Sequence, residues 1–389
     1  MFYHLCSLAL ISLVLGLAAV RRCSLYSPLV ISASIWLVVF VTGLIFEERF
    51  YPLQEKAFIA WIIWFIVTSL IFFLLSPTGT KNSWTETEIR RLPLDYTLPL
   101  LLLIAWLVYM TWQVGSSGPD HFFLNLRLSA TNREGFASLG TIVRFYPLIF
   151  ALFLFEHVYA HRENRHLRLF LWCFMLLYAV ATMGKLAILT PVVSWVIIQG
   201  IRGKMKVAKV VVLAAVVFAL MMSLHFMRAA VSNETTIEDV LAIYIYSPLV
   251  ALGHIDIDNS LPIGAYVFRF FYAFGNYMDI APQPVETILP WVEIPEPTNT
   301  YTLMHPFYSD FGLLGVLLQA VSYGFFFSGL YWLSIKRGGL WLVLFSGYSI
   351  VLVGQFIGDF LVINLSGNLQ VFIYAIIIFL FSKEVCYAH

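Results

Sequence analysis

Residues 57–75 read AFIAWIIWFIVTSLIFFLL, a run of nineteen positions without a charged side chain. A helix of this length rises about 28 Å, close to the hydrocarbon core of a bilayer, which is about 30 Å thick. The whole chain shares this character, since 60% of its 389 residues are hydrophobic and 12% are charged, against about 45–50% and about 25% in soluble domains. These values exclude a water-soluble fold, and we predict an all-α, polytopic membrane protein.

Ten further apolar runs are long enough to be considered as spans, which gives about eleven transmembrane helices in one integral membrane domain over 1–389. They cover 2–20, 28–46, 98–114, 140–158, 169–183, 186–201, 207–227, 307–333, 340–361 and 367–382. Their apolar residues are continuous rather than alternating, which excludes a membrane β-barrel. Residues 169–201 would be too long for one crossing, so we expect a break at Gly184 and Lys185.

The basic residues set the predicted orientation, because short cytoplasmic loops of membrane proteins are enriched in Lys and Arg. With an outer N-terminus and a cytoplasmic C-terminus, fifteen of the 23 basic residues lie inside. These are Arg21, Arg22, Lys81, Arg90, Arg91, Arg162, Arg165, Arg168, Arg202, Lys204, Lys206, Lys209, Lys336, Arg337 and Lys383. Because Arg21 and Arg22 follow the first apolar run, we interpret that run as a retained span and not as a cleaved signal peptide.

Two outer segments are long enough to carry function, Gly115 to Leu139 (115–139) and the larger loop from Arg228 to Pro306 (228–306). In the larger loop, 240–252 and 264–278 are apolar and aromatic enough to form helices on the membrane surface, whereas the Pro-rich stretch after them cannot be helical. Charged residues within the spans are few, which disfavours an ion-coupled transporter. We therefore expect the working surface on the outer face.

Five arginines of the outer face are candidate ligands of an anionic group, because a guanidinium grips phosphate oxygens with two hydrogen bonds and keeps its charge. They are Arg127, Arg133, Arg144, Arg228 and Arg269. The alternative is that each reaches toward lipid headgroups or pairs with a carboxylate. The aromatic residues of the large loop likewise fit either a membrane-interface belt or stacking on sugar rings.

A metal or disulfide framework is not expected. The four cysteines form no CxxC pair, and His254, Asp256 and Asp258 have no second cluster to complete a ligand set. Asp-Phe-Gly at 310–312 matches a kinase magnesium motif, but the phosphate loop and the catalytic loop of kinases are missing from the sequence. We therefore predict no cofactor and no metal, and nothing indicates a nucleic-acid partner.

The stretch NTYTLMHPFYSDFGLLG at 299–315 resembles the signature of the Wzy-type O-antigen polymerases, which polymerise oligosaccharide repeat units in bacteria. The number of spans and the late large outer loop are also similar to that family. The resemblance implies a GT-C-like glycosyltransferase of the inner membrane, acting at its periplasmic face on undecaprenyl-pyrophosphate-linked oligosaccharides. It also implies that neither metal nor nucleotide sugar is needed, and that a chain-length regulator protein is a partner.

Within this resemblance, Arg127, Arg133, Arg228 and Arg269 are counterparts by position of the family's loop arginines, and Asn299 and Tyr301 belong to the signature as substrate-binding candidates. The chemistry needs a charged pyrophosphate to leave and an acceptor hydroxyl to lose its proton. For the proton we favour His305, with Asp310 next; the alternative is that His305 has a structural role and caps the start of the span. Two other functions remain open, a repeat-unit flippase and an O-antigen ligase.

Overall fold

The computed structural model describes residues 1–77, 90–131, 135–159, 165–228, 236–255, 260–286 and 288–384. These residues are mostly helical, with four two-residue strands in two antiparallel pairs. The contacts divide the chain into two compact units, whereas the sequence predicts one domain. Unit 1 comprises Met1–Lys81, Thr235–Leu333 and Val351–Ser366, and unit 2 comprises Asn82–Glu234, Ser334–Ile350 and Gly367–His389.

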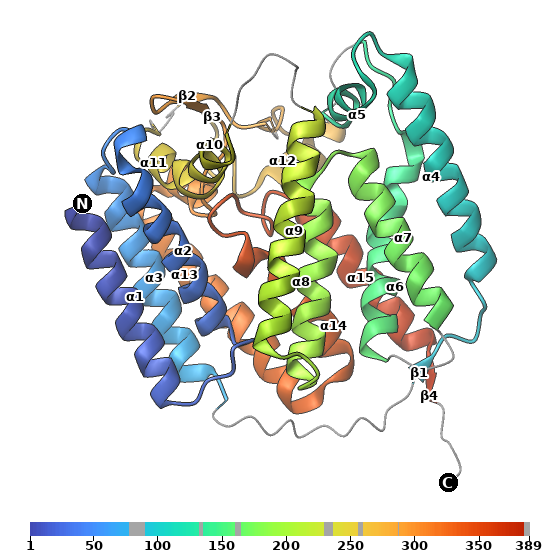
Figure 1. Ribbon diagram of the computed structural model, residues 1–389, viewed down its shortest axis with the longest axis horizontal. Helices are drawn as coiled ribbons and strands as arrows, with labels where there is room; N and C mark the ends of the chain where they lie inside the picture. The colour runs from blue at the N-terminus through green and yellow to red at the C-terminus, as the bar shows by residue number, and fades with distance from the viewer. Residues whose placement is uncertain are drawn as a thin grey trace. The chain divides into compact units, whose positions relative to one another are not determined.

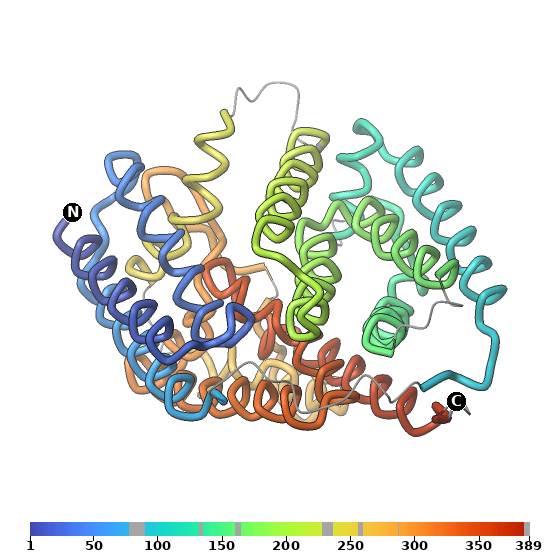
Figure 2. Tube along the Cα trace, turned by 60° about the horizontal axis from the view of Figure 1, so that its bottom comes forward, coloured from blue at the N-terminus to red at the C-terminus, as the bar shows by residue number. Residues whose placement is uncertain are grey.

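Unit 1 begins with three long apolar helices that lie side by side in both views (Figures 1 and 2). They are α1 (Phe2–Val20), α2 (Pro28–Phe46) and α3 (Glu55–Leu75), with the short turn η1 (Glu47–Arg49) after α2. Ser27 caps α2 by accepting a hydrogen bond from the backbone N–H of Val30, and Pro28 occupies the first turn, where no N–H is needed. Large aromatic side chains, among them Trp36, Phe40 and Trp61, fill the space between these helices.

The residues of the predicted large loop follow as short elements, most of which lie at one end of α1–α3 (Figure 1). They are α10 (Ile237–Leu241), the π-helical turn η4 (Ala242–Tyr246), α11 (Ser247–Gly253), α12 (Arg269–Tyr277), and the pair β2 (Val292–Glu293) and β3 (Pro297–Thr298). The unit continues into α13 (His305–Arg337), whose last residues belong to unit 2. As predicted, the Pro-rich stretch after α12 contains no helix among its described residues.

Unit 2 is a second group of helices, with the small pair β1 (Arg90–Arg91) and β4 (Lys383–Glu384). Its other elements are α4 (Thr97–Ser117), α5 (Phe122–Ala130), η2 (Gly140–Phe145), α6 (Tyr146–Val158), α7 (Arg165–Ala181), α8 (Lys185–Ile201), α9 (Val207–Arg228), α14 (Gly339–Val353) and α15 (Leu365–Phe381). Helix α7 packs against α4, α6 and α8, and α8 packs against α9. The stacked rings of Tyr146 and Tyr178, 4.3 Å apart, join α6 to α7.

The helices bear out the membrane class that the composition predicts. Seven helical segments within the described residues are long and apolar enough to cross a membrane: Phe2–Val20, Pro28–Arg49, Glu55–Leu75, Thr97–Ser117, Gly140–Val158, Val207–Met227 and His305–Arg337. Three shorter apolar helices are Lys185–Ile201, Gly339–Val353 and Leu365–Phe381. Each of the eleven predicted runs contains a helix, and the count of eleven crossings stays a prediction.

Two boundaries can be compared in detail with the sequence. The break expected at Gly184 is confirmed, because α7 ends at Ala181 and α8 begins at Lys185. The run predicted over 340–361 was too long, since α14 already ends at Val353 and the chain is non-helical until α15. In this segment Gln355 and Asp359 are buried and the apolar side chains are half-buried, so hydropathy alone does not show where the helix ends.

The two aromatic segments of the large loop have different surroundings. The side chains of α11 are buried, with Leu249, Val250 and Leu252 fully inaccessible, and the helix packs against α3. This burial shows that α11 packs on α3, and the expectation that 240–252 lies on or dips into the membrane surface stays a prediction. Helix α12 instead exposes Phe271, Phe274 and other aromatic residues, so its position on the membrane surface stays a prediction.

Candidate functional site

Residues 305–311 form a short first segment of α13 that is set off from the rest of the helix. Gly312 interrupts the helix with φ 59° and ψ −145°, a conformation that only glycine adopts readily. A Cβ at Gly315 would lie 2.0 Å from the carbonyl oxygen of Phe307, so the two segments approach too closely for any side chain there. Gly312 and Gly315 thus form a bend at which the helical segment 305–311 changes direction and packs closely against the start of the main helix.

A cavity of about 350 Å³ is lined in part by this bent segment. It brings together three of the predicted site residues, His305, Asp310 and Tyr301. Tyr266 and Trp291 also line it, and His254 does so from the end of α11. All of these residues belong to unit 1. A cavity of this size holds a small ligand such as one sugar ring.

His305 is the first residue of α13 and is 3% exposed. Its ring lies against the rings of Tyr301 and Tyr266, with centroids 4.6 and 5.0 Å away, and its backbone N–H donates to the carbonyl oxygen of Thr302 at 3.0 Å. Its Nδ1 atom has no hydrogen-bond partner among the described residues. The ring belongs to a residue that lines the cavity, and a neutral imidazole can accept a proton.

Asp310 is tied to the backbone of a neighbouring segment. Its carboxylate accepts a hydrogen bond from the N–H of Val267 at 2.8 Å and from the N–H of Tyr266 at 3.1 and 3.3 Å to its two oxygens. These bonds fix the turn that places Tyr266 next to His305. The arrangement makes Asp310 a hydrogen-bond acceptor that shapes the cavity wall.

Tyr301 and Trp291 form an aromatic part of the wall. The hydroxyl of Tyr301 donates to the carbonyl oxygen of Pro290 at 2.9 Å, and burial, with a smaller contribution from the nearby Tyr266, raises the pKa of Tyr301 to about 12. The phenol therefore stays protonated at neutral pH. Trp291 directly follows Pro290 and is 66% exposed, so its ring offers an apolar face at the cavity. Aromatic faces of this kind suit the apolar C–H faces of a sugar ring.

Two predicted binding residues of unit 1 do not line this cavity as described. Arg269 begins α12, and its Nε atom donates to the carbonyl oxygen of Val285 at 2.8 Å, which links α12 to the Pro-rich stretch. Asn299 follows β3 directly and is half-buried. Neither observation tests a role in binding, and both roles stay predictions.

The remaining predicted arginines belong to unit 2. Arg127 lies in α5 and is half-buried, and Arg144 lies in η2 and is exposed. Arg228 is the last residue of α9, and only its backbone is described. Arg133 lies outside the described residues. Unit 2 thus contains four of the five arginines that the sequence assigns to an anionic ligand.

The charge of the cavity is negative or neutral within unit 1. None of the described residues that line it is Lys or Arg, and Asp310 contributes a carboxylate. The residues of the large loop that lie outside the description, 229–235, 256–259 and 287, also contain no Lys or Arg in the sequence. This wall is poorly suited to a pyrophosphate and well suited to an uncharged polar ligand.

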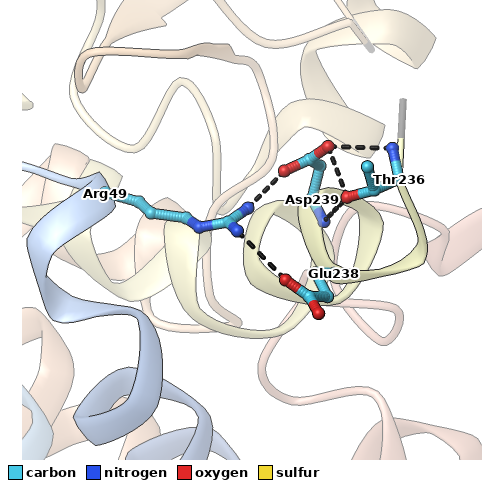
Figure 3. Close-up of polar contacts among 4 residues, drawn as sticks. All are labelled: Arg49, Thr236, Glu238 and Asp239. Atoms are coloured by element: carbon cyan, nitrogen blue, oxygen red, sulfur yellow. Dashed lines mark hydrogen bonds and ion pairs between the residues drawn. The ribbon is translucent and has the colours of Figure 1, made fainter. Parts of the chain in front are cut away.

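Arg49 of η1 and Lys56 near the start of α3 hold the segment from α10 to Ile255. Arg49 forms ion pairs with Asp239 and, at 3.3 Å, with Glu238 (Figure 3). Hydrogen bonds from the hydroxyl and N–H of Thr236, and then the Arg49 charge, lower the pKa of Asp239 below its ordinary value. Lys56 adds a hydrogen bond to the carbonyl oxygen of Ile255 at 3.1 Å. These contacts fix α10 and the end of α11 on the helices beneath them.

Sequence reasoning missed three cavity residues as site residues: His254, Tyr266 and Trp291. Tyr266 and Trp291 were visible as part of the aromatic enrichment of the large loop, which fits sugar stacking. His254 was considered only as a metal ligand. Within the described residues no group of three His, Cys, Asp or Glu side chains is placed to hold a metal ion, and Asp256 and Asp258 lie outside them.

Fold and site together define the class of the chain, a polytopic helical membrane protein with an aromatic cavity in one of its compact units. Comparison with models of protein families, with curated proteins and with solved structures finds no match to this chain.

Proposed function

We propose that this protein polymerises undecaprenyl-pyrophosphate-linked oligosaccharide repeat units into a surface polysaccharide at the periplasmic face of the bacterial inner membrane. One observation carries the proposal: the 299–315 signature supplies His305, Asp310 and Tyr301 to a single cavity whose wall also contains Tyr266 and Trp291. A base beside aromatic faces is the arrangement that an acceptor sugar requires.

In the proposed reaction, His305 accepts the proton of an acceptor hydroxyl bound in the cavity. The hydroxyl oxygen then attacks the anomeric carbon of the growing glycan, a new C–O bond forms, and the bond to the pyrophosphate breaks. The leaving undecaprenyl pyrophosphate carries the bonding electron pair. Asp310 acts through its hydrogen bonds to Tyr266 and Val267, which keep the wall next to His305 in place.

The cavity wall contains a carboxylate and no described cation, so the proposed pyrophosphate ligands are the predicted arginines, none of which lines it as described. Arg127, Arg133, Arg144 and Arg228 of unit 2 are the proposed ligands. Their guanidinium groups would neutralise the charge that grows as the leaving group departs. Arg269, whose Nε atom donates to the carbonyl oxygen of Val285, is the fifth candidate.

The proposed setting is a multi-pass inner-membrane protein with a periplasmic N-terminus and a cytoplasmic C-terminus. Within unit 1 the N-terminal amine contacts Glu47, and Arg49 contacts α10, so Met1, the α2–α3 connection and the large loop share one side, as the predicted topology requires. Within unit 2, Arg90 pairs with Glu384 at 2.6 Å, and both are predicted to be cytoplasmic. A chain-length regulator is the proposed protein partner.

The test is deletion of the gene followed by a gel of the surface glycan. Loss of a polymerase should leave single repeat units attached to the surface molecule that normally bears the long chains. Loss of a flippase or of a ligase should leave no repeat unit attached to that molecule. Restoration of long chains by the intact gene, but not by a His305→Ala version present at the same level in the membrane, would support the assigned base. Absence of any attached repeat after deletion would reject polymerisation.

A further inference from the structure

Asp359 is a carboxylate buried inside unit 1, 1% exposed, without a cationic partner among the described residues. Four donors surround it: the hydroxyl of Tyr323 at 2.7 and 2.8 Å, Nε2 of Gln319 at 3.0 Å, and the N–H groups of Leu361 and Val362, both at 2.9 Å. A buried carboxylate is costly, and apolar side chains of similar volume often serve stability equally well. The cost suggests that Asp359 has a more specific task.

The network leads directly to the signature stretch. The same Nε2 atom of Gln319 that donates to Asp359 also donates to the carbonyl oxygen of Leu303 at 2.8 Å. The N–H of Leu303 donates to the backbone carbonyl oxygen of Gln355 at 2.9 Å. Both backbone polar groups of Leu303 are therefore held by residues from α13 and from the segment after α14. Leu303 stands midway between Tyr301 and His305.

Gln355 is itself rigidly held. Its Oε1 atom accepts hydrogen bonds from the indole N–H groups of Trp36 at 2.9 Å and Trp64 at 3.2 Å, and from the hydroxyl of Ser32 at 3.2 Å. Its Nε2 atom donates to the carbonyl oxygen of Leu352 at 3.0 Å. Donors from α2 and α3 thus fix the residue whose backbone carbonyl receives Leu303.

We propose that Asp359, Gln319 and Gln355 form a clamp that positions the segment 301–305, and with it the Tyr301 and His305 side chains of the cavity. Asp359 orients the Gln319 amide. The carboxyl oxygen of Asp359 and the Leu303 carbonyl oxygen are both acceptors, so the amide must point its NH₂ group, which has two donors, toward them. These are positioning residues, since none of the three lines the cavity as described. Only the catalytic consequence rests on the proposed function.

The first arm of the test measures how often the segment 301–305 opens, without any enzymatic assay. Thr302 is 1% exposed, so Thr302→Cys is introduced into a full-length chain whose native cysteines are replaced by Ser. The rate of maleimide labelling of the detergent-purified protein then reports how readily the segment 301–305 opens to solvent. Gln319→Leu and Asp359→Asn should each raise the labelling rate about tenfold or more. In these variants the clamp's hydrogen bonds are already missing, so the local opening that exposes the cysteine costs less free energy.

Thr68→Val is the matched control, because the Thr68 hydroxyl is fully buried in the same unit yet bonds only to the backbone of its own helix. It should leave the labelling rate at the parent value. In the second arm, elongation of lipid-linked repeat units should show a kcat about 10-fold to 100-fold lower in the clamp variants with KM unchanged.

Unchanged labelling in both clamp variants would overturn the proposal, whatever the activity. Equal acceleration of labelling by Thr68→Val would also overturn it, since the effect would then be general loosening of the unit. Faster labelling in the clamp variants alone supports the clamp even if the parent protein elongates nothing, in which case the proposed function fails and the clamp stands. Two clamp variants are used so that failure of one to insert leaves the other to decide.

Discussion

Replacing Gly315 by Ala should damage the candidate site through one defined clash. The new methyl group would lie 2.0 Å from the carbonyl oxygen of Phe307 and 2.9 Å from the Cβ atom of Phe311. An ordinary contact between carbon and a carbonyl oxygen is about 3.3 Å or longer, so the 305–311 segment must move by about 1.3 Å. This segment contains both His305 and Asp310.

A displacement of about 1 Å in a catalytic group can lower the rate about 100-fold, and overpacking of this kind costs about 1–3 kcal/mol of stability. Gly315→Ala should therefore shorten the surface glycan strongly while the protein remains in the membrane. The assay compares glycan chain length on a gel with protein abundance and thermal stability in detergent.

Gly329→Ala is the matched control in the same helix, because a Cβ there meets no atom within 4 Å. Alanine is about 1 kcal/mol more favourable than glycine inside a helix, so this variant should keep full chain length and equal or higher stability. Normal chain length with Gly315→Ala at normal abundance would refute the argument that the bend positions the site.

Three further predictions follow from the site. His305→Gln should lower elongation about 100-fold to 10,000-fold with protein abundance unchanged, measured with purified protein and lipid-linked repeats, because a general base contributes that much; a rate within tenfold of the parent would exclude it as the base. Trp291→Ala should raise KM for the acceptor more than it lowers kcat, whereas Trp332→Ala, also exposed in unit 1, should change neither; equal effects would remove the stacking role. Arg49→Gln should speed hydrogen exchange of the α10 amides at neutral pH, and the difference from the parent should shrink at acidic pH. The pKa of Asp239 is lowered on folding, so its ion pair contributes fully above the unfolded pKa and is lost as pH falls through the folded value. A difference that persists when Asp239 is protonated would contradict this.

Local features of the fold could be predicted from the sequence because they depend on neighbouring residues. A bilayer-length apolar run needs a helix to satisfy its backbone, so each of the eleven runs contains one. The break at Gly184 follows from length alone. The buried position of α11 could not be predicted, because Leu249 and Val250 are equally suited to lipid and to a protein interior.

The site was predictable only where the signature names it. His305, Asp310 and Tyr301 come from one stretch of seventeen residues, and the structure brings them to one cavity. The partners of that stretch lie far away in sequence, since Tyr266 reaches Asp310 across 44 positions. Elsewhere in the same unit, Arg49 reaches Asp239 across 190. Such pairings depend on tertiary packing, which periodicity and composition do not encode for a single sequence. The link from Asp359 through Gln319 to Leu303 is likewise a product of tertiary packing.

The central claim is most directly tested by reconstituting the purified protein in vesicles with undecaprenyl-pyrophosphate-linked repeat units and following product length, in the presence of a chelator. The account predicts products of two and more repeats with release of undecaprenyl pyrophosphate, lost in His305→Gln and retained in Thr68→Val. Movement of intact single repeats across the bilayer without any elongation would contradict it.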